Sequence, residues 1–175
     1  IYSSNEITSN AVSSEQKLMV VFKSLGVTCS GNEVVKGLEE IKSEARKIFN
    51  DDTFAEDLNI SLDGYSITYN EINNNYTIKL NSCPSSEDFI VKSVVKATRA
   101  DDEIYIYQAF GYFVKGPENK YFVYDSALKT NQIGEFIDEA GTKEFNEVEK
   151  LKQFKWTFKK SSDNNYYFVS VTPVI

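Results

Sequence analysis

The sequence predicts an α+β fold in which N-terminal amphipathic helices pack on a curved antiparallel β-sheet. Apolar residues first recur with the helical period of about 3.6 residues, and beyond residue 57 they recur with the two-residue period of strands. Helices followed by adjacent strands are expected when helices cover one face of an antiparallel sheet. No Pro-, Gly- or Ser-rich linker intervenes. Residues 1–175 are therefore predicted to form a single domain, with 1–12 as a flexible or trimmed N-terminal segment.

The first helix is predicted from Ser14 to Leu25. Ser13 and Gln16 have the spacing of a capping box, which satisfies backbone N–H groups at a helix start. Gly26 supplies the left-handed residue with which many helices end. One face of this helix is apolar and carries Leu18, Val21, Phe22 and Leu25.

A second capping box at Ser30 to Glu33 predicts a helix that continues to Phe49. After this helix, two interpretations remain open for Thr53 to Leu58, which either forms a short helical turn or leads directly into a strand. The apolar stripe of the second helix carries Val34, Leu38, Ile41, Ala45 and Ile48.

The rest of the chain is predicted to form strands, because apolar and polar residues alternate and Gly, Asn and Asp stand between the runs. Residues 126–150 are less regular, and Ile133, Phe136 and Ile137 could anchor a short helix or an irregular crossing. The predicted strands are Leu58 to Leu62, Tyr65 to Asn70, Tyr76 to Leu80, Val91 to Ala100, Glu103 to Val114, Lys120 to Asp125, Phe154 to Phe158 and Tyr166 to Thr172.

The strand from Glu103 to Val114 has apolar bulk on both faces, since Tyr105 and Tyr107 lie opposite Ile104 and Ile106. One face should meet the helices. The other is either internal in a strongly curved sheet or is covered by a strand layer, by a second chain in a homodimer or by a ligand. The candidate interaction surface comprises Tyr105, Tyr107 and Phe113.

The formal charge of −7 disfavours nucleic acid and anionic lipid as partners, leaving a protein or a small molecule as the expected ligand. No apolar run reaches the roughly 20 residues that span a bilayer. The chain begins without Met, so we expect a signal or anchor segment to have been removed. The expected location is extracellular or anchored at the cell surface.

The chain has no His and no phosphate-binding or nucleophile-elbow motif, so no catalytic residue, metal site or cofactor is predicted. Acidic runs such as Asp51–Asp52 and Asp101 to Glu103 are interpreted as turns, with a catalytic carboxylate pair as the alternative. Cys29 and Cys83 lack metal-ligand spacing. They could form a disulfide or remain two unpaired thiols.

The C-terminal hairpin formed by Lys155 to Lys160, Ser161 to Asn165 and Tyr166 to Val171 follows a capped amphipathic helix and a strand meander. From about residue 30 to 175 this arrangement resembles the cystatin-like or nuclear-transport-factor-2-like superfold. It also resembles the ends of small exported proteins of low-GC Gram-positive bacteria that have no assigned activity. The resemblance implies a cone between helix and sheet. Some members use such a cone for isomerase or dehydratase chemistry, and others only dimerise or bind partners.

No catalytic residue of that superfold can be placed on this sequence. We therefore expect a non-enzymatic binding or assembly domain of an exported or cell-envelope bacterial protein. Two alternatives remain. The first is a small-molecule enzyme or carrier with a pocket between helix and sheet. The second is an anchored component of a secretion or conjugation apparatus.

Overall fold

The structure is a computed structural model in which the chain divides into two compact units. Unit 1 comprises residues 1–7, 84–157 and 170–175, and unit 2 comprises residues 8–83 and 158–169. Each unit therefore contains chain segments that are distant in sequence. The residues that the structure describes are 5–28, 32–55, 59–62, 65–80, 88–126, 128–139, 141, 145 and 147–174.

The predicted fold class is wrong. Over the described residues the structure is mostly antiparallel β-sheet, and its strands form two separate sheets instead of one curved sheet covered by helices. Within the described ranges there are two α-helices, α1 (Ser14–Ser24) and α2 (Leu38–Phe49), and both belong to unit 2. Hydrophobic periodicity predicts single elements, whereas sheet membership depends on which strands pair, and no local pattern encodes that pairing.

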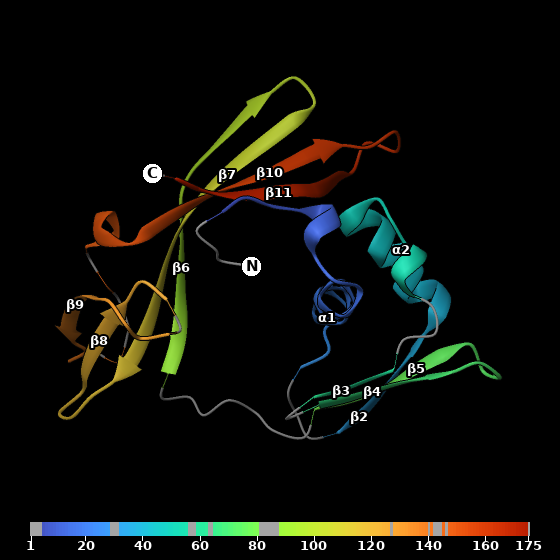
Figure 1. The fold of residues 1–175 in the computed structure, drawn as a ribbon, viewed down its shortest axis with the longest axis horizontal. Coiled ribbons are helices and arrows are strands. Elements are labelled where there is room, and N and C mark those ends of the chain that lie inside the picture. The colour runs from blue at the N-terminus through green and yellow to red at the C-terminus, as the bar shows by residue number, and fades with distance from the viewer. Residues whose placement is uncertain are drawn as a thin grey trace. The chain divides into compact units, whose positions relative to one another are not determined.

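Unit 2 contains the helices, a four-stranded antiparallel sheet in the order β2-β5-β4-β3, and the tip of a hairpin formed by β10 and β11. Figure 1 shows both helices between the small sheet and this tip. The rings of Phe22 on α1 and Tyr76 on β5 have centroids 5.7 Å apart. The sheet strands are β2 (Glu33–Gly37), β3 (Ile60–Leu62), β4 (Tyr65–Asn70) and β5 (Asn75–Leu80).

Helix α1 begins as predicted. The Ser13 hydroxyl accepts a hydrogen bond from the Gln16 N–H at 3.3 Å, and the Ser13 N–H donates to Gln16 Oε1 at 3.2 Å. Gly26 has a φ of +76°, the left-handed conformation expected after the helix. A short 3-10 helix, Thr53–Ala55, confirms the helical alternative over its first residues.

The predicted start of the second helix is wrong. Residues Glu33–Gly37 form β2, and Val34 and Val35 lie opposite Ile78 and Thr77 of β5. Helix α2 starts only at Leu38. The β-branched pair suits a strand better than a helix, and pairing with β5 outweighs the helical spacing of the apolar residues.

Unit 1 contains most of a seven-stranded sheet in the order β1-β11-β10-β7-β8-β9, with β6 paired to β7. Strand β9 replaces the short helix or irregular crossing considered for this region, because it pairs with β8 over most of its length. The strands are β1 (Ile7–Thr8), β6 (Asp88–Ala100), β7 (Glu103–Lys115), β8 (Lys120–Tyr124), β9 (Gln132–Ile137), β10 (Lys152–Lys160) and β11 (Tyr166–Val174).

The core of unit 1 is built around β7 and β8. The rings of Phe113 and Phe145 meet edge to face there, with their centroids 5.7 Å apart. Gly111 is needed beside them, because a Cβ atom there would lie 2.9 Å from the Leu151 side chain. The buried cluster consists of Ala109, Phe113, Tyr121, Val123, Phe145 and Leu151.

Candidate ligand-binding pocket in unit 2

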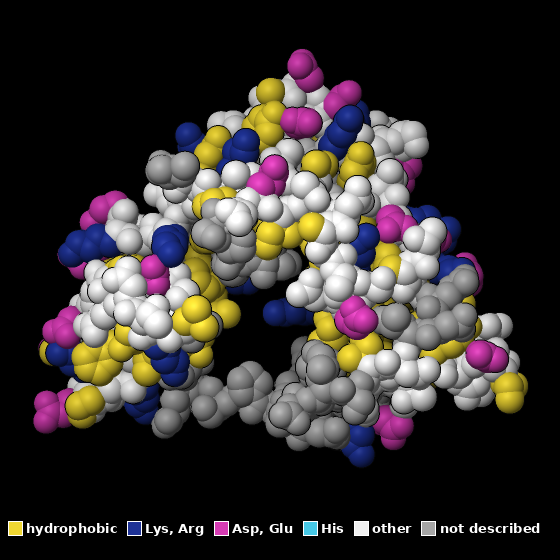
Figure 2. All heavy atoms as spheres, viewed as in Figure 1, with side chains coloured by type: hydrophobic (Ala, Val, Ile, Leu, Met, Phe, Trp, Pro, Cys, Tyr) yellow, Lys and Arg dark blue, Asp and Glu magenta, His cyan; other side chains and the backbone are white. Residues whose placement is uncertain are grey.

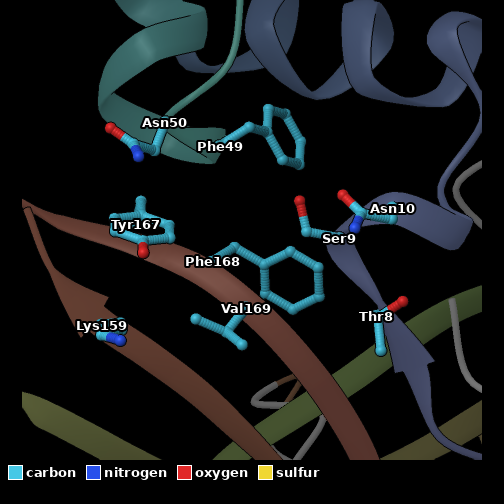
Figure 3. A pocket seen from close by; sticks show the side chains of 9 residues that line it. All are labelled: Thr8, Ser9, Asn10, Phe49, Asn50, Lys159, Tyr167, Phe168 and Val169. Atoms are coloured by element: carbon cyan, nitrogen blue, oxygen red, sulfur yellow. The ribbon is translucent and has the colours of Figure 1, made fainter.

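A pocket of about 420 Å³ lies within unit 2. Its lining comes from residues 8–10, from Phe49 and Asn50 at the end of α2, from Lys159 on β10 and from residues 167–169 on β11. Figure 3 shows these side chains around one open space. The N-terminal segment, the end of α2 and the β10–β11 hairpin, which are far apart in sequence, therefore meet here.

Local structure fixes the position of each segment. Asn50 caps the end of α2 in the left-handed conformation, with φ 53°, and its N–H donates to the Arg46 carbonyl at 2.9 Å. Ser9 and Asn10 belong to a 3-10 turn, Ser9–Ala11, that follows β1. Asn tolerates the left-handed conformation better than most residues, which suits it to this corner of the chain.

The pocket contacts β11 at three consecutive residues. Tyr167, Phe168 and Val169 are consecutive residues of one strand, so their side chains alternate between its two faces. A pocket that contacts all three must extend past the side of the strand. Phe168 and Phe49 form its apolar floor, because both are 6% exposed and their rings meet edge to face with centroids 6.3 Å apart.

The rim of the pocket is polar. None of its six polar side chains forms a hydrogen bond or ion pair with another group in the part of the chain that the structure describes. Such groups are available to a ligand or to water. The six are Thr8, Ser9, Asn10, Asn50, Lys159 and Tyr167.

Among the described residues that line the pocket, Lys159 alone is charged. The carboxylates that follow Asn50 are engaged elsewhere, since Asp51 accepts from Lys17 at 3.0 Å and Asp52 pairs with Arg46 at 2.9 Å. Burial alone would raise the pKa of Asp51, but hydrogen bonds from Thr53 and Lys17 outweigh burial and lower it below the usual value. The lining therefore carries one positive charge.

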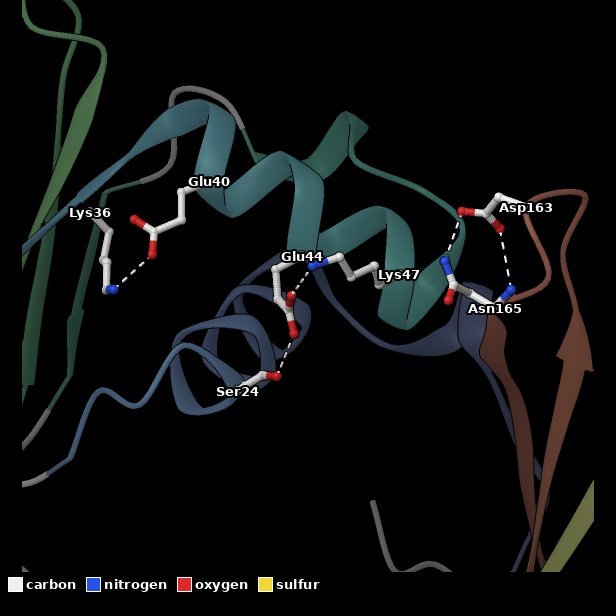
Figure 4. A network of polar contacts seen from close by, with 7 residues as sticks. All are labelled: Ser24, Lys36, Glu40, Glu44, Lys47, Asp163 and Asn165. Carbon is white, nitrogen blue, oxygen red and sulfur yellow. Dashed lines mark hydrogen bonds and ion pairs between the residues drawn. The ribbon is translucent and has the colours of Figure 1, made fainter.

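A polar contact outside the pocket links α2 to α1 (Figure 4). The Ser24 hydroxyl on α1 donates to Glu44 on α2 at 2.6 Å, and Lys47 pairs with the same carboxylate at 3.1 Å. The hydrogen bond from Ser24, with the charge of Lys47, lowers the pKa of Glu44. The Ser24 hydrogen bond therefore links α1 to the helix whose last residue, Phe49, and C-cap, Asn50, line the pocket.

The residues predicted to form an interaction surface lie in unit 1, outside this pocket. Phe113 is fully buried and presents no surface to a partner. Tyr105 and Tyr107 are half-buried, and lysines of the same chain lie over their rings, with Lys155 Nζ 5.3 Å from the Tyr105 centroid and Lys96 Nζ 4.3 Å from that of Tyr107. A hydrogen bond to Glu103 raises the pKa of Tyr105.

The candidate disulfide between Cys29 and Cys83 lies outside the described residues. Over the described ranges, no group of three or more Cys, Asp or Glu side chains is arranged to hold a metal ion. Neither α-helix found there has the length and apolar character needed to cross a membrane. On the face shown in Figure 2, acidic and basic side chains are interspersed.

Sequence reasoning missed the pocket. Lys159 and Tyr167 read as ordinary solvent-facing strand positions, and Asn50 reads as the end of a helix. The signal that could have drawn attention to Asn50 is its left-handed cap, but the pocket residues on β10 and β11 are more than a hundred residues away from it in sequence. Only the tertiary structure brings them together.

Comparisons of this chain with protein-family models, with curated proteins and with solved structures give no match. The resemblance to the cystatin-like superfold therefore stays a prediction, and the geometry of the pocket carries the functional argument.

Proposed function

We propose that this chain is a non-enzymatic binding domain of an exported or cell-envelope bacterial protein, and that its ligand site is the pocket in unit 2. The observation that carries the proposal is the set of six polar side chains that have no partner among the described residues and surround the apolar floor of Phe49 and Phe168. Ligand sites commonly combine an apolar lining with a few polar groups that fix orientation.

The size and chemistry of the pocket support binding of a small molecule. Its volume of about 420 Å³ falls within the range of roughly 300–1,000 Å³ that is typical of such sites. The hydroxyls of Thr8, Ser9 and Tyr167 can each donate and accept hydrogen bonds, and the amides of Asn10 and Asn50 can do both as well. The ligand can therefore be held by several directional contacts.

The same lining supports binding over catalysis. Over the described part of the lining, its hydroxyl groups have no carboxylate, thiolate or imidazole beside them to act as a general base. The proposal of an exported protein is supported by the resemblance of the C-terminal hairpin described above.

The proposal is tested by titrating ¹⁵N-labelled protein with a library of small polar fragments and following backbone amide shifts. We expect saturable shifts that centre on residues 9–10, 50 and 167–169. Asn50→Gly should weaken the hits by about threefold to tenfold, because it removes one amide hydrogen-bonding group while glycine keeps the left-handed backbone.

Asn164→Gly is the matched control, since Asn164 also has a left-handed backbone, with φ 67°, and does not line the pocket. It should leave fragment affinity unchanged. A library screen that produces no saturable shifts at the pocket would contradict the proposed function, as would equal weakening by the two glycine variants.

A further inference from the structure

We infer that the pocket in unit 2 binds a hydroxylated carboxylate of the size of a sugar acid, with the carboxylate at Lys159 and the hydroxyls along the polar rim. This inference rests on the proposed binding function and names the class of its ligand. It combines three properties of the lining: its charge, its hydrogen-bonding groups and its floor.

The charge of the lining selects an anion. Lys159 has no ion pair within the described part of the chain, and no carboxylate lines the pocket. Asp51 and Asp52, next to Asn50, are neutralised by Lys17 and Arg46. A ligand carboxylate at Lys159 would gain a charge-assisted hydrogen bond without facing an opposing acid in the lining.

The neutral rim selects a ligand with several hydroxyl groups. Two amides and three hydroxyls surround the space, and each group can both donate and accept. A purely apolar carboxylate would displace water from these groups without replacing its hydrogen bonds, and that loss weakens binding. Sugar hydroxyls can donate and accept in the same way, so they can replace the displaced water.

The floor suits one face of a sugar ring. Phe49 and Phe168, whose rings meet edge to face, contribute carbon surface to the floor of the pocket. A sugar ring carries C–H groups on its faces and hydroxyls around its edge. Such a molecule can therefore place its ring face on the floor and its hydroxyls on the rim at the same time. The pocket volume, near the lower end of the small-molecule range, fits a ligand of one or two rings.

The inference is tested by measuring the affinity of the protein for glucuronate, glucuronamide, glucose and benzoate by NMR titration at low ionic strength. Glucuronate should bind about tenfold more tightly than its neutral amide or glucose, because it alone combines the hydroxyls with a charged partner for Lys159. Benzoate tests the carboxylate without hydroxyls and should also bind about tenfold more weakly than glucuronate.

Lys159→Gln should remove the preference for glucuronate over glucuronamide. Lys160→Gln is the matched control, because it makes the same charge change at the next residue of β10, whose side chain points to the opposite face and does not line the pocket. Tyr167→Phe is a second variant and should weaken glucuronate and glucose equally, since it removes one rim hydroxyl. The amide spectrum of each variant reports whether it is folded.

The outcomes separate the inference from the function on which it rests. If benzoate binds as tightly as glucuronate, or if Lys160→Gln reduces the preference as much as Lys159→Gln, the sugar-acid inference is overturned. If none of the four probes shifts the pocket amides but library fragments do, that inference also fails while the binding function stands. If neither the probes nor the fragments shift them, both fail.

Discussion

Lys17 is a buried lysine on α1 whose ammonium group depends on one carboxylate. Its Nζ lies 3.0 Å from Asp51, and the rings of Phe49 and Phe54 lie within 5.6 Å and 5.2 Å of it. The aromatic faces attract the cation, but they do not replace a charged hydrogen-bond acceptor. The ion pair therefore links α1 to the end of α2, beside the pocket.

Asp51→Asn should destabilise the protein by about 2 kcal/mol at pH 7, because it leaves a buried ammonium group without its anion. Since the folded pKa of Asp51 lies below the unfolded value of about 3.9, its contribution is full above that pH and disappears as the pH falls through the folded pKa. The difference between the two proteins should therefore shrink below pH 4. Urea denaturation over a pH series measures it.

Asp52→Asn provides the comparison. Asp52 pairs with Arg46, whose side chain is more than half exposed, so its loss should cost under about 1 kcal/mol. An Asp51→Asn variant as stable as Asp52→Asn at neutral pH would show that Lys17 has other means of stabilisation.

Strand β6 is a 13-residue strand at the edge of its sheet, paired with β7 on one side. It exposes Val94 and Val95, which makes it a template for unwanted pairing with another chain. Two features oppose such pairing. The register shifts between Val94 and Lys96, which marks a bulge or irregularity, and Lys96 and Arg99 place cations on the strand. The edge is thus protected by both geometry and charge.

Lys96→Val should increase self-association, because it removes one of these charges and also uncovers the Tyr107 ring. Light scattering over a concentration series should show dimers or larger species at concentrations where the unmodified protein remains unchanged. Lys115→Val, at the end of β7, makes the same substitution away from this edge and should have little effect. Equal behaviour of the two variants would argue against a protective role for Lys96.

The sequence predicts helices and strands well where capping and turn residues close by in the chain determine their ends. The Ser13 capping box and Gly26 set the ends of α1, and alternation with turn residues locates β4, β6, β7, β10 and β11 to within a few residues. It fails at Glu33–Gly37, where helical spacing competes with strand pairing. It also fails to resolve Gln132–Ile137, where pairing with β8 outweighs an ambiguous local pattern.

The pocket could not be predicted because each of its residues follows the rules of its own element. Lys159 occupies a polar position in the alternating apolar and polar pattern of β10, and Asn50 is the C-cap of α2. By contrast, the predicted tyrosine surface came from a real pattern, two apolar faces on β7. In the structure Phe113 fills the core on one of those faces, and Lys96 and Lys155 cover the tyrosines.

At the scale of the whole molecule, the prediction of a single domain stays a prediction. The two units have separate buried cores, one around Phe113 and one around Leu18 and Ile41, yet β10 and β11 run through both. Shared strands favour coupled unfolding, whereas separate cores favour independent unfolding.

Native-state hydrogen exchange should show that the cores are energetically distinct. Leu18→Ala should lower protection mainly in unit 2 and Phe113→Ala mainly in unit 1, each by about 3 kcal/mol, because each truncation leaves a cavity in one core. Val35→Ala, at a position 59% exposed, controls for substitution itself and should change little. Equal loss of protection in both units by either truncation would instead indicate one cooperative domain.

The division of unit 2 into residues 8–83 and 158–169 has a consequence for the order of assembly during synthesis. Its helices emerge from the ribosome early, but Phe168, which packs on Phe49, arrives only after the whole of residues 84–157. Contacts of such long sequence separation form slowly, since a long loop must close first. Until Phe168 is synthesised, the nascent chain would expose the Phe49 side of α2. Chaperones that recognise apolar surface could bind α2 during this interval.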